Sequence, residues 1–279
     1  MPTMPTTPIS KVAQPPDYWP MFEAYHRVRE PVYRAIIADS GMAPNDLILD
    51  AACGNAFYSR LIAYVLGADV RIVAADRNPA LLHSQPDPGL AILRCQSDVE
   101  QAGLRHSTFD AIWLCRSMHA ALDPLWRLCA LASLLRPGGR MIVIENDLAH
   151  CPILSWPADF ERRVQEAHYQ LLKSRCADGS SIERYHAARH LSTWLAQAGL
   201  RPVSVHTYAV EDVAPMAADV EKYWKLAMDY LGNLIQPFLS LEDRQAYSRA
   251  FDPESSDYLL RRAGFYCLEP ITVACGIAP

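Results

Sequence analysis

The sequence lacks the features that mark a membrane protein or a nucleic-acid-binding protein. No uncharged apolar run is long enough to span a bilayer. Residues 1–16 lack the apolar core of a signal peptide, so we expect a flexible leader and a cytoplasmic protein. Lysine and arginine number 26 against 31 aspartate and glutamate residues, which gives a net charge of −5. We therefore expect neither nucleic acid nor a membrane as a partner, while a homodimer is left open.

Motifs of several common binding sites are also missing. None of the eight cysteines forms a C-x-x-C pair, so we expect buried thiols rather than disulfides or a zinc site. No G-K-[ST] sequence occurs, which argues against nucleoside triphosphate hydrolysis. Glu183, His186 and His190 share a helix face, but no further ligand completes the set, so we predict no metal site.

What the sequence does contain is a repeated alternation of apolar runs and helical patterns. Hydrophobic residues make up 51% of the 279 residues, which is enough for a large core. The apolar runs are continuous, as expected for strands covered on both faces of a parallel, doubly wound α/β sheet. The expected strands are 47–50, 71–75, 91–95, 109–115, 140–145, 201–210 and 271–277, and the expected helices are 57–66, 79–83, 123–135 and 187–199.

Three segments lie outside this alternation. Residues 17–45 predict two short helices separated at Pro31. Residues 147–183 and 212–268 predict helical insertions within a single domain that covers residues 17–279. The second insertion contains nine aromatic residues, which suits an apolar lid over a medium-sized organic substrate, although packing of the insertion's own core accounts for about half of them.

The first loop of the predicted sheet has the composition of a ligand-binding turn. The first strand leads into Asp50-Ala51-Ala52-Cys53-Gly54-Asn55-Ala56, and a helix follows. Small residues allow a tight turn in which a ligand contacts backbone amides at the helix N-terminus. The dinucleotide pattern G-x-G-x-x-G would require a small residue at position 57. Phe57 stands there instead, so an NAD-dependent oxidoreductase is a weak alternative.

Residues 46–146 resemble class I S-adenosylmethionine-dependent methyltransferases. LDAACGNAFYSRL resembles the first motif of that family, acidic-x-G-x-G-x-G, with Ala52 and Ala56 in place of two glycines and Gly54 in the middle position. FDAIWLCRSMHAALDP resembles the segment around the family's fourth strand, and LLRPGGRMIVIE resembles the helix, turn and strand that follow. The resemblance implies a Rossmann-like fold with S-adenosylmethionine as cofactor.

The resemblance also implies which residues contact the cofactor. Asp76 would bind the ribose hydroxyls and Asp98 the adenine, although either could instead be a helix cap. A ring and an arginine on the N-terminal helices would cover the cofactor and meet its carboxylate. The complete set of expected cofactor contacts is Tyr25, Arg29, Asp50, Ala52, Gly54, Asn55, Asp76, Arg77, Asp98, Val99, Cys115 and Arg116.

Candidates for the chemistry and for acceptor binding are fewer. His119 follows the fourth strand, where the acceptor should lie, and its ordinary pKa suits a general base. The alternative is that it only opens the next helix or bonds the cofactor. We expect His168 and Tyr169 of the first insertion, and Tyr223 and Trp224 of the second, to contact the substrate.

These patterns predict a methyltransferase that acts on an oxygen or nitrogen atom of a medium-sized, partly apolar small molecule in secondary metabolism. A macromolecular methyltransferase is a weaker alternative, because residues 115–118 read Cys-Arg-Ser-Met rather than [ND]-P-P-[FYW] and no basic stripe accompanies them. A cofactor-binding protein repurposed as a cyclase or non-methylating module stays open, because its cofactor loop would look the same.

Overall fold

A mixed β-sheet forms the centre of the protein. The computed structural model describes residues 16–279 except 68, 88, 101–102, 149–151 and 177, so the expected leader, apart from residue 16, lies outside the described residues. The strand order is β3-β2-β1-β4-β5-β8, with β6 and β7 both paired to β8. The strands are β1 (Leu47–Ala51), β2 (Arg71–Asp76), β3 (Ile92–Gln96), β4 (Phe109–Cys115), β5 (Leu135–Glu145), β6 (Ile153–Leu154), β7 (Arg201–Val213) and β8 (Tyr266–Ile277).

The sheet confirms the predicted doubly wound architecture with seven main strands, to which the two-residue β6 is added. Strands β1 to β5 are parallel, as expected from their continuous apolar runs. Strand β8 differs from the expectation of a parallel sheet, because it runs antiparallel to both β5 and β7. The strand order reverses between β1 and β4, so a crevice opens at their carboxyl ends, where α/β sheets bind ligands.

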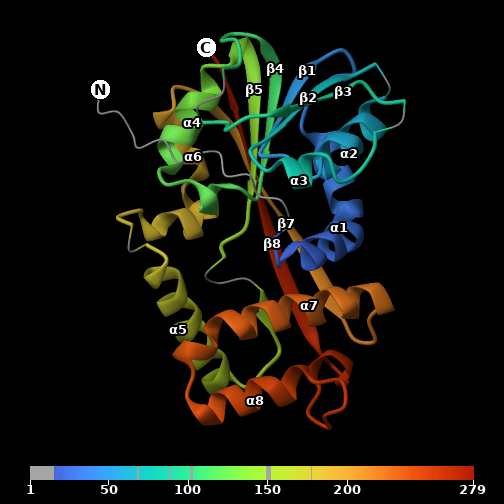
Figure 1. Ribbon diagram of the computed structural model, residues 1–279, viewed down its shortest axis with the longest axis vertical. Coiled ribbons are helices and arrows are strands. Elements are labelled where there is room, and N and C mark those ends of the chain that lie inside the picture. The colour runs from blue at the N-terminus through green and yellow to red at the C-terminus, as the bar shows by residue number, and fades with distance from the viewer. Residues whose placement is uncertain (1–15, 68, 88, 101–102, 149–151, 177) are drawn as a thin grey trace.

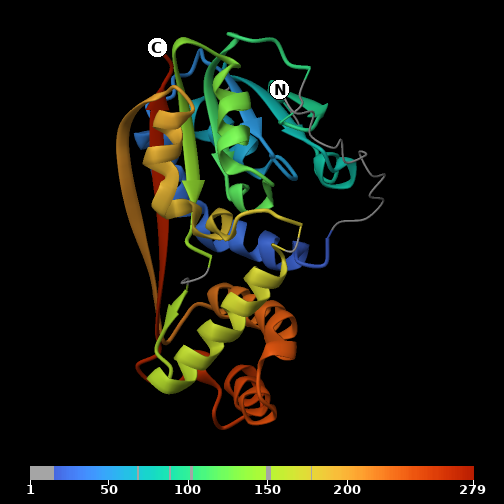
Figure 2. The same ribbon diagram turned by 90° about the vertical axis from the view of Figure 1, so that its left-hand side faces the viewer.

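Helices cover both faces of the sheet and give it two cores (Figures 1 and 2). Ile48 and Trp113 face α1 and α2, whereas their neighbours Leu49 and Ile112 face α4 and α6. All four side chains have no exposed surface. Adjacent residues of one strand are therefore buried on opposite faces, which explains why the sequence runs are apolar throughout. The helices of this part are α1 (Trp19–Asp39), α2 (Phe57–Leu66), α3 (Pro79–Leu82), α4 (Pro124–Ala132) and α6 (Ala187–Gln197).

A further layer of helices lies beyond the carboxyl ends of the parallel strands (Figures 1 and 2). It is built from the two insertions, and the long strands β7 and β8 extend down to it. This layer faces the crevice of the sheet. Among the described residues, no helix is long and apolar enough to cross a membrane. The layer consists of α5 (Ala158–Ser174), α7 (Ala218–Ile235) and α8 (Leu241–Phe251), and short 3₁₀ helices occur at η1 (Met118–Ala120), η2 (Ile182–His186), η3 (Gln236–Phe238) and η4 (Leu259–Arg261).

The expected break at Pro31 is wrong, because α1 is one continuous helix. Proline removes a backbone hydrogen bond and crowds the preceding turn, at a cost of about 3 kcal/mol. Tyr25, Tyr33 and Ile37 are buried on both sides of Pro31, whose own side chain is exposed. Burial of this apolar face keeps the helix together through the proline.

The boundary between α4 and β5 also differs from the prediction. The helix ends at Ala132, three residues earlier than expected, and β5 begins at Leu135 rather than at residue 140. The turn expected within LLRPGGRMIVIE is instead an irregular stretch of β5 around Pro137 and Gly138, where Gly138 has a φ of 77°. The pairing between β4 and β5 shifts register at Phe109, so the strand absorbs the glycine as a bulge.

Candidate active site

The loop between β1 and α2 has the left-handed backbone of a glycine motif, although only its middle member is glycine. Ala52, Gly54 and Ala56 have φ values of 57°, 56° and 61°. Left-handed backbone costs a residue with a side chain roughly 1–2 kcal/mol. The two alanines therefore hold a strained turn, of the kind that folded proteins retain at functional sites.

Asp50 and Asn55 stabilise this loop through hydrogen bonds to residues at the start of α2. Asp50 is buried at the end of β1, where it accepts a hydrogen bond of 2.5 Å from Ser59 Oγ, and burial raises its pKa to about 7. The Asn55 side chain accepts from the amide of Phe57 at the start of α2. Neither residue lines the cavity described below. Their hydrogen bonds are made to the first turn of α2 and stabilise the loop.

Two aspartates follow the loop at the ends of neighbouring strands and line a common cavity. Asp76 ends β2, and its two oxygens accept from the amides of Gly54 and Asn78, each at 2.8 Å. Asp98 follows β3 and accepts from the amide of Glu100 at 3.0 Å. Each carboxylate has about four lone-pair sites, so both retain capacity for hydroxyl or amino donors. Arg77 and Val99 line the cavity beside them.

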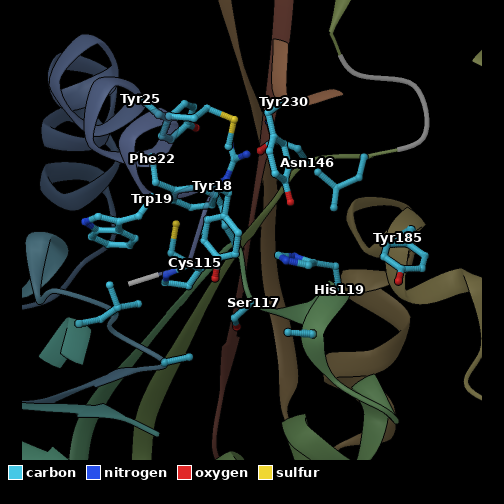
Figure 3. Close-up of a pocket in the computed structure, with 18 of the residues that line it drawn as sticks. Tyr18, Trp19, Phe22, Tyr25, Cys115, Ser117, His119, Asn146, Tyr185 and Tyr230 are labelled. Carbon is cyan, nitrogen blue, oxygen red and sulfur yellow. The ribbon is translucent and has the colours of Figure 1, made fainter. Parts of the chain in front are cut away.

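The cavity has a volume of about 960 Å³ and runs from these aspartates to the helical layer. Figure 3 shows side chains from α1, the strand ends and α7 that point into it. Tyr25 lines the cavity, and its hydroxyl pairs with that of Tyr33 at 2.9 Å. Cys115 and Arg116 line the cavity at the end of β4, with the Arg116 guanidinium 4.2 Å from the centre of the Tyr25 ring.

His119 enters the cavity from η1, directly after β4 (Figure 3). Its Nδ1 is buried and has no hydrogen-bond partner among the described residues. Burial lowers its pKa to about 4, and the positive charges of Arg116, Arg127, Arg184 and Arg175 lower it further in the same direction. The imidazole is therefore neutral near pH 7 and can accept a proton or a hydrogen bond.

Glu145 fixes the turn that carries His119, a role that the sequence did not reveal. Its carboxylate ends β5, is buried, and accepts from the amides of Ser117 and Met118, each at 2.7 Å. Burial raises its pKa to about 7. Arg116 next to this turn has a φ of 51°, so the chain is held in left-handed backbone where it leaves β4.

Arg29 lies apart from the cavity, contrary to the expectation that it meets a cofactor carboxylate. Its side chain is 2% exposed, and it pairs with Asp212 at 2.6 Å and with Glu269 at 2.9 Å. Both carboxylates come from strands at the far end of the chain. Arg116 is the arginine that lines the cavity in this region, and it shares Glu269 with Arg29.

Three of the four expected substrate contacts line the acceptor side of the cavity: His168, Tyr223 and Trp224. Tyr169, one residue after His168 on α5, is 40% exposed and does not line it. Several residues that the sequence analysis missed complete the wall. They are Tyr18, Trp19, Phe22, Ser117, Asn146, Tyr185, Tyr230 and Glu269.

The missed aromatic residues had a detectable signal. Tyr18 and Phe22 recur at helical spacing with the expected contact Tyr25, which indicates one face of the N-terminal helix but not whether that face meets the core or a cavity. The polar lining residues Asn146 and Glu269 had no such signal, because they meet across 123 residues of sequence.

A family model described as a methyltransferase domain matches residues 49–143, the segment that forms β1 to β5. The match covers the loop, the two strand-end aspartates and the β4 turn. Residues 49–143 form a class I S-adenosylmethionine-dependent methyltransferase domain.

Curated relatives of this methyltransferase domain include enzymes of quinone biosynthesis. The ubiquinone/menaquinone biosynthesis C-methyltransferase UbiE of Cellvibrio japonicus is 30% identical over 128 residues, which is 44% of this chain and 51% of the relative. A ubiquinone biosynthesis O-methyltransferase of Xanthomonas campestris pv. campestris is 33% identical over 118 residues, which is 40% of this chain and 48% of the relative. The chain thus spans about half the length of these relatives.

Solved structures share the methyltransferase fold over most of the chain. Phosphoethanolamine N-methyltransferase 2 of Haemonchus contortus has a TM-score of 0.51 at 11% identity and covers 94% of this chain and 58% of that one. The [4+2]-cyclase SpnF has a TM-score of 0.52 at 13% identity and covers 90% of this chain and 81% of that one. At these identities the likeness concerns the fold alone.

The cavity of the methyltransferase domain suits S-adenosylmethionine, the cofactor of the family. The carboxylates of Asp76 and Asp98 keep free acceptor sites at the end where ribose and adenine would lie. His26 Nδ1 and Ser117 Oγ are buried in the cavity wall without partners among the described residues, so polar ligand groups could satisfy them.

Proposed function

We propose that the protein transfers a methyl group from S-adenosylmethionine to an oxygen or nitrogen atom of a medium-sized, partly apolar small molecule of secondary metabolism. The observation that carries this proposal is the continuity of the cavity. It joins the two strand-end aspartates to a chamber walled by α5 and α7, so one space accommodates both the cofactor and a second organic molecule. In this proposal the insertions 147–183 and 212–268 serve as covers over the acceptor.

In this proposal some cavity residues bind the cofactor, and others align the acceptor or accept its proton. S-adenosylmethionine, when bound, supplies an electrophilic methyl group on a sulfonium centre. Asp76 would hold the ribose hydroxyls, Asp98 the adenine amino group, and the backbone at Gly54 the methionine end. His119 would accept a hydrogen bond or the proton from the acceptor, and the aromatic wall would exclude water and align the two molecules.

Cofactor binding tests the first part of this proposal. Isothermal titration calorimetry with S-adenosylhomocysteine should show binding to the full chain. Asp76→Asn removes a charged acceptor and should weaken that binding about 10- to 100-fold, since hydrogen bonds to charged groups contribute roughly 1.5–3 kcal/mol. Asp69→Asn is the control, because Asp69 is exposed before β2, away from the cavity. Equal affinity of both variants would show that Asp76 does not bind the ribose.

A non-methylating cyclase is the second candidate, because the fold is shared with the [4+2]-cyclase SpnF. The two functions differ in what happens to the cofactor. A methyltransferase releases S-adenosylhomocysteine in step with acceptor consumption, whereas a cyclase converts its substrate without consuming the cofactor. Mass spectrometry of the reaction mixture separates them.

A further inference from the structure

The acceptor end of the cavity carries more positive than negative charge. Four arginines lie close enough to His119 to lower its pKa. Two of them have carboxylate partners, since Arg116 pairs with Glu269 at 3.2 Å and Arg127 pairs with Glu100 at 2.6 Å. The other two, Arg175 and Arg184, have no ion pair with a carboxylate among the described residues.

Arg184 is a buried guanidinium held by neutral groups. Its side chain belongs to η2, and the residue is 7% exposed. It donates to the carbonyl oxygens of Ala121 and Arg175 at 3.3 and 2.9 Å, and to the Tyr185 hydroxyl at 3.0 Å. Its Nε has no partner among the described residues. Hydrogen bonds from Ser180 lower the pKa of the exposed Asp178, and the Arg184 charge adds to this effect without forming an ion pair with that carboxylate. A buried cation without a counter-charge is costly unless a ligand supplies one nearby. Arg184 itself does not line the cavity, so a ligand would offset its charge from the neighbouring wall formed by Arg175 and Tyr185.

Arg175 brings a second charge to the cavity itself. It caps the C-terminal end of α5, lines the cavity and is exposed to solvent at its rim. Its backbone carbonyl accepts from the Arg184 guanidinium, which places the Arg184 charge at the end of α5 that Arg175 caps. Tyr185, which accepts from Arg184, also lines the cavity, and Figure 3 shows it on the same side of the view as His119.

The geometry points to a carboxylate-bearing acceptor: we infer that the substrate of the proposed methyltransferase places a carboxylate at Arg175, beside Tyr185 and Arg184. This inference rests on the proposed function and names the substrate class. A guanidinium binds a planar carboxylate through paired hydrogen bonds, which makes arginine the usual partner of such a group.

The remaining walls suit the rest of such a molecule. Met228, Leu231 and Leu234 of α7 and Leu171 of α5 line the same chamber, so the body of the acceptor would lie against apolar surface. At the other end, His119 Nδ1 and the buried Asn146 Oδ1, which has no partner in the part of the chain that the structure describes, present polar atoms at the ends of β4 and β5. An acid with an apolar body and a protic group away from its carboxylate would fit this arrangement. Its carboxylate would meet Arg175, its body would lie against the apolar wall, and its protic group would meet the polar atoms of His119 and Asn146.

A bound carboxylate would also change His119. The arginine charges contribute to the low pKa of the imidazole, and an anion near Arg175 and Arg184 would offset them. Acceptor binding would therefore raise the basicity of His119 toward its ordinary value. Proton removal would then become easier only when the substrate is in place.

The test compares an acid with its neutral amide. Isothermal titration calorimetry on the full chain saturated with S-adenosylhomocysteine measures binding of 6-hydroxy-2-naphthoate and 6-hydroxy-2-naphthamide, in which the hydroxyl lies at the opposite end of the ring system from the carboxylate or amide. We expect the acid to bind at least tenfold more tightly. Arg175→Ala should remove most of that preference and Arg175→Lys should keep part of it. Arg162→Ala is the matched control, because Arg162 is exposed on the same helix and does not line the cavity.

Three results would overturn the inference. They are equal affinity for acid and amide, a preference that survives Arg175→Ala, and failure of the acid to bind while S-adenosylhomocysteine does. The proposed function has a separate readout in the same experiment, because it fails if S-adenosylhomocysteine itself does not bind. The acid and amide can then still be compared on the cofactor-free chain.

Discussion

Single residues at the ends of β4 and β5 set the electrostatics of the cavity. Burial shifts the pKa of His119 downward and that of Glu145 upward, so both groups favour their neutral forms. Neutral groups suit a site that would bind a sulfonium and a polar acceptor without water between them. The two residues lead to separate predictions, since one faces the ligand and the other holds the backbone.

His119 should not titrate in the range where histidines usually do. Because its pKa is lowered to about 4, the imidazole should stay neutral from pH 5 to 9. NMR titration of the ring signals, assigned with His119→Asn, should show no inflection near the ordinary value of about 6.5. Replacement by alanine should lower turnover about 100-fold if His119 removes the proton. An inflection near pH 6.5 that disappears in His119→Asn would contradict this prediction.

Glu145 should make the fold less stable as the pH rises. Its folded-state pKa is raised from 4.5 to about 7, so the folded chain holds a proton that the unfolded chain releases. The stabilisation is complete below about pH 4.5 and is lost as the pH rises through about 7, by on the order of 2–3 kcal/mol. Glu145→Gln keeps the acceptor oxygen without the titration, so its denaturation free energy should lack the part of this decline that Glu145 causes, whereas the part due to Asp50, whose pKa is also raised to about 7, should remain.

The control for Glu145 is Glu242→Gln, an exposed position at the start of α8. This variant should follow the pH dependence of the parent protein, because no buried charge is removed. Urea denaturation at pH 5, 7 and 8.5 gives the comparison. If Glu145→Gln and Glu242→Gln lose stability alike at high pH, the buried carboxylate is not the cause.

At the scale of elements, the sequence predicted the bounds of those helices and strands that a local hydrophobic pattern specifies. Strand β4 and helix α2 match their expected bounds, because continuous apolar runs and an amphipathic stripe each specify one local structure. The alanines at positions 52 and 56 still adopt glycine-like backbone, so the resemblance identified the loop despite two substitutions. The prediction from local pattern was wrong at Pro31, because burial of apolar side chains on both sides of the proline outweighs its cost to the helix.

The proline in α1 should be a source of instability that packing overcomes. Pro31→Ala would restore a backbone donor in the middle of the helix, and Pro31 is exposed, so no core contact is lost. The helix-interior cost of about 3 kcal/mol exceeds the entropy that proline removes from the unfolded chain, so unfolding should cost about 1–2 kcal/mol more. Pro20→Ala, in the first turn of the same helix, should give no such gain. Thermal denaturation measures both, and equal shifts would contradict the argument.

At the scale of the whole molecule, one buried network joins the sheet to the helical layer. Arg29 of α1 pairs with Asp212 of β7 and Glu269 of β8, and Asp212 also accepts from Trp224 Nε1 of α7 at 2.7 Å. Arg116, directly after β4, joins the network through Glu269. These partners are up to 240 residues apart in sequence, so no periodicity or motif could pair them. Because this separation in sequence hides the ion pairs, the sequence analysis placed Arg29 at the cofactor, whereas the structure places it in the buried network behind the cavity wall.

Asp212→Asn should loosen the helical layer without weakening the cofactor site. The change leaves the Arg29 cation with a carboxylate that it must share with Arg116, and removes a charged acceptor from Trp224. Breaking a buried ion pair costs about 3 kcal/mol, so urea denaturation should show a loss of that order. Asp212 does not line the cavity, so S-adenosylhomocysteine affinity should change little, whereas amide hydrogen exchange across α7 should accelerate.

Glu211→Gln provides the comparison for Asp212, because it alters the neighbouring carboxylate on the exposed face of β7. Among the described residues, that carboxylate accepts a hydrogen bond only from the Tyr266 hydroxyl at the protein surface, so its loss should cost less than about 0.5 kcal/mol and leave exchange in α7 unchanged. Similar exchange in the two variants would mean that the network does not hold α7 in place. A large loss of cofactor affinity in Asp212→Asn alone would instead mean that the network supports the cofactor end, and that the two ends of the cavity are mechanically one unit.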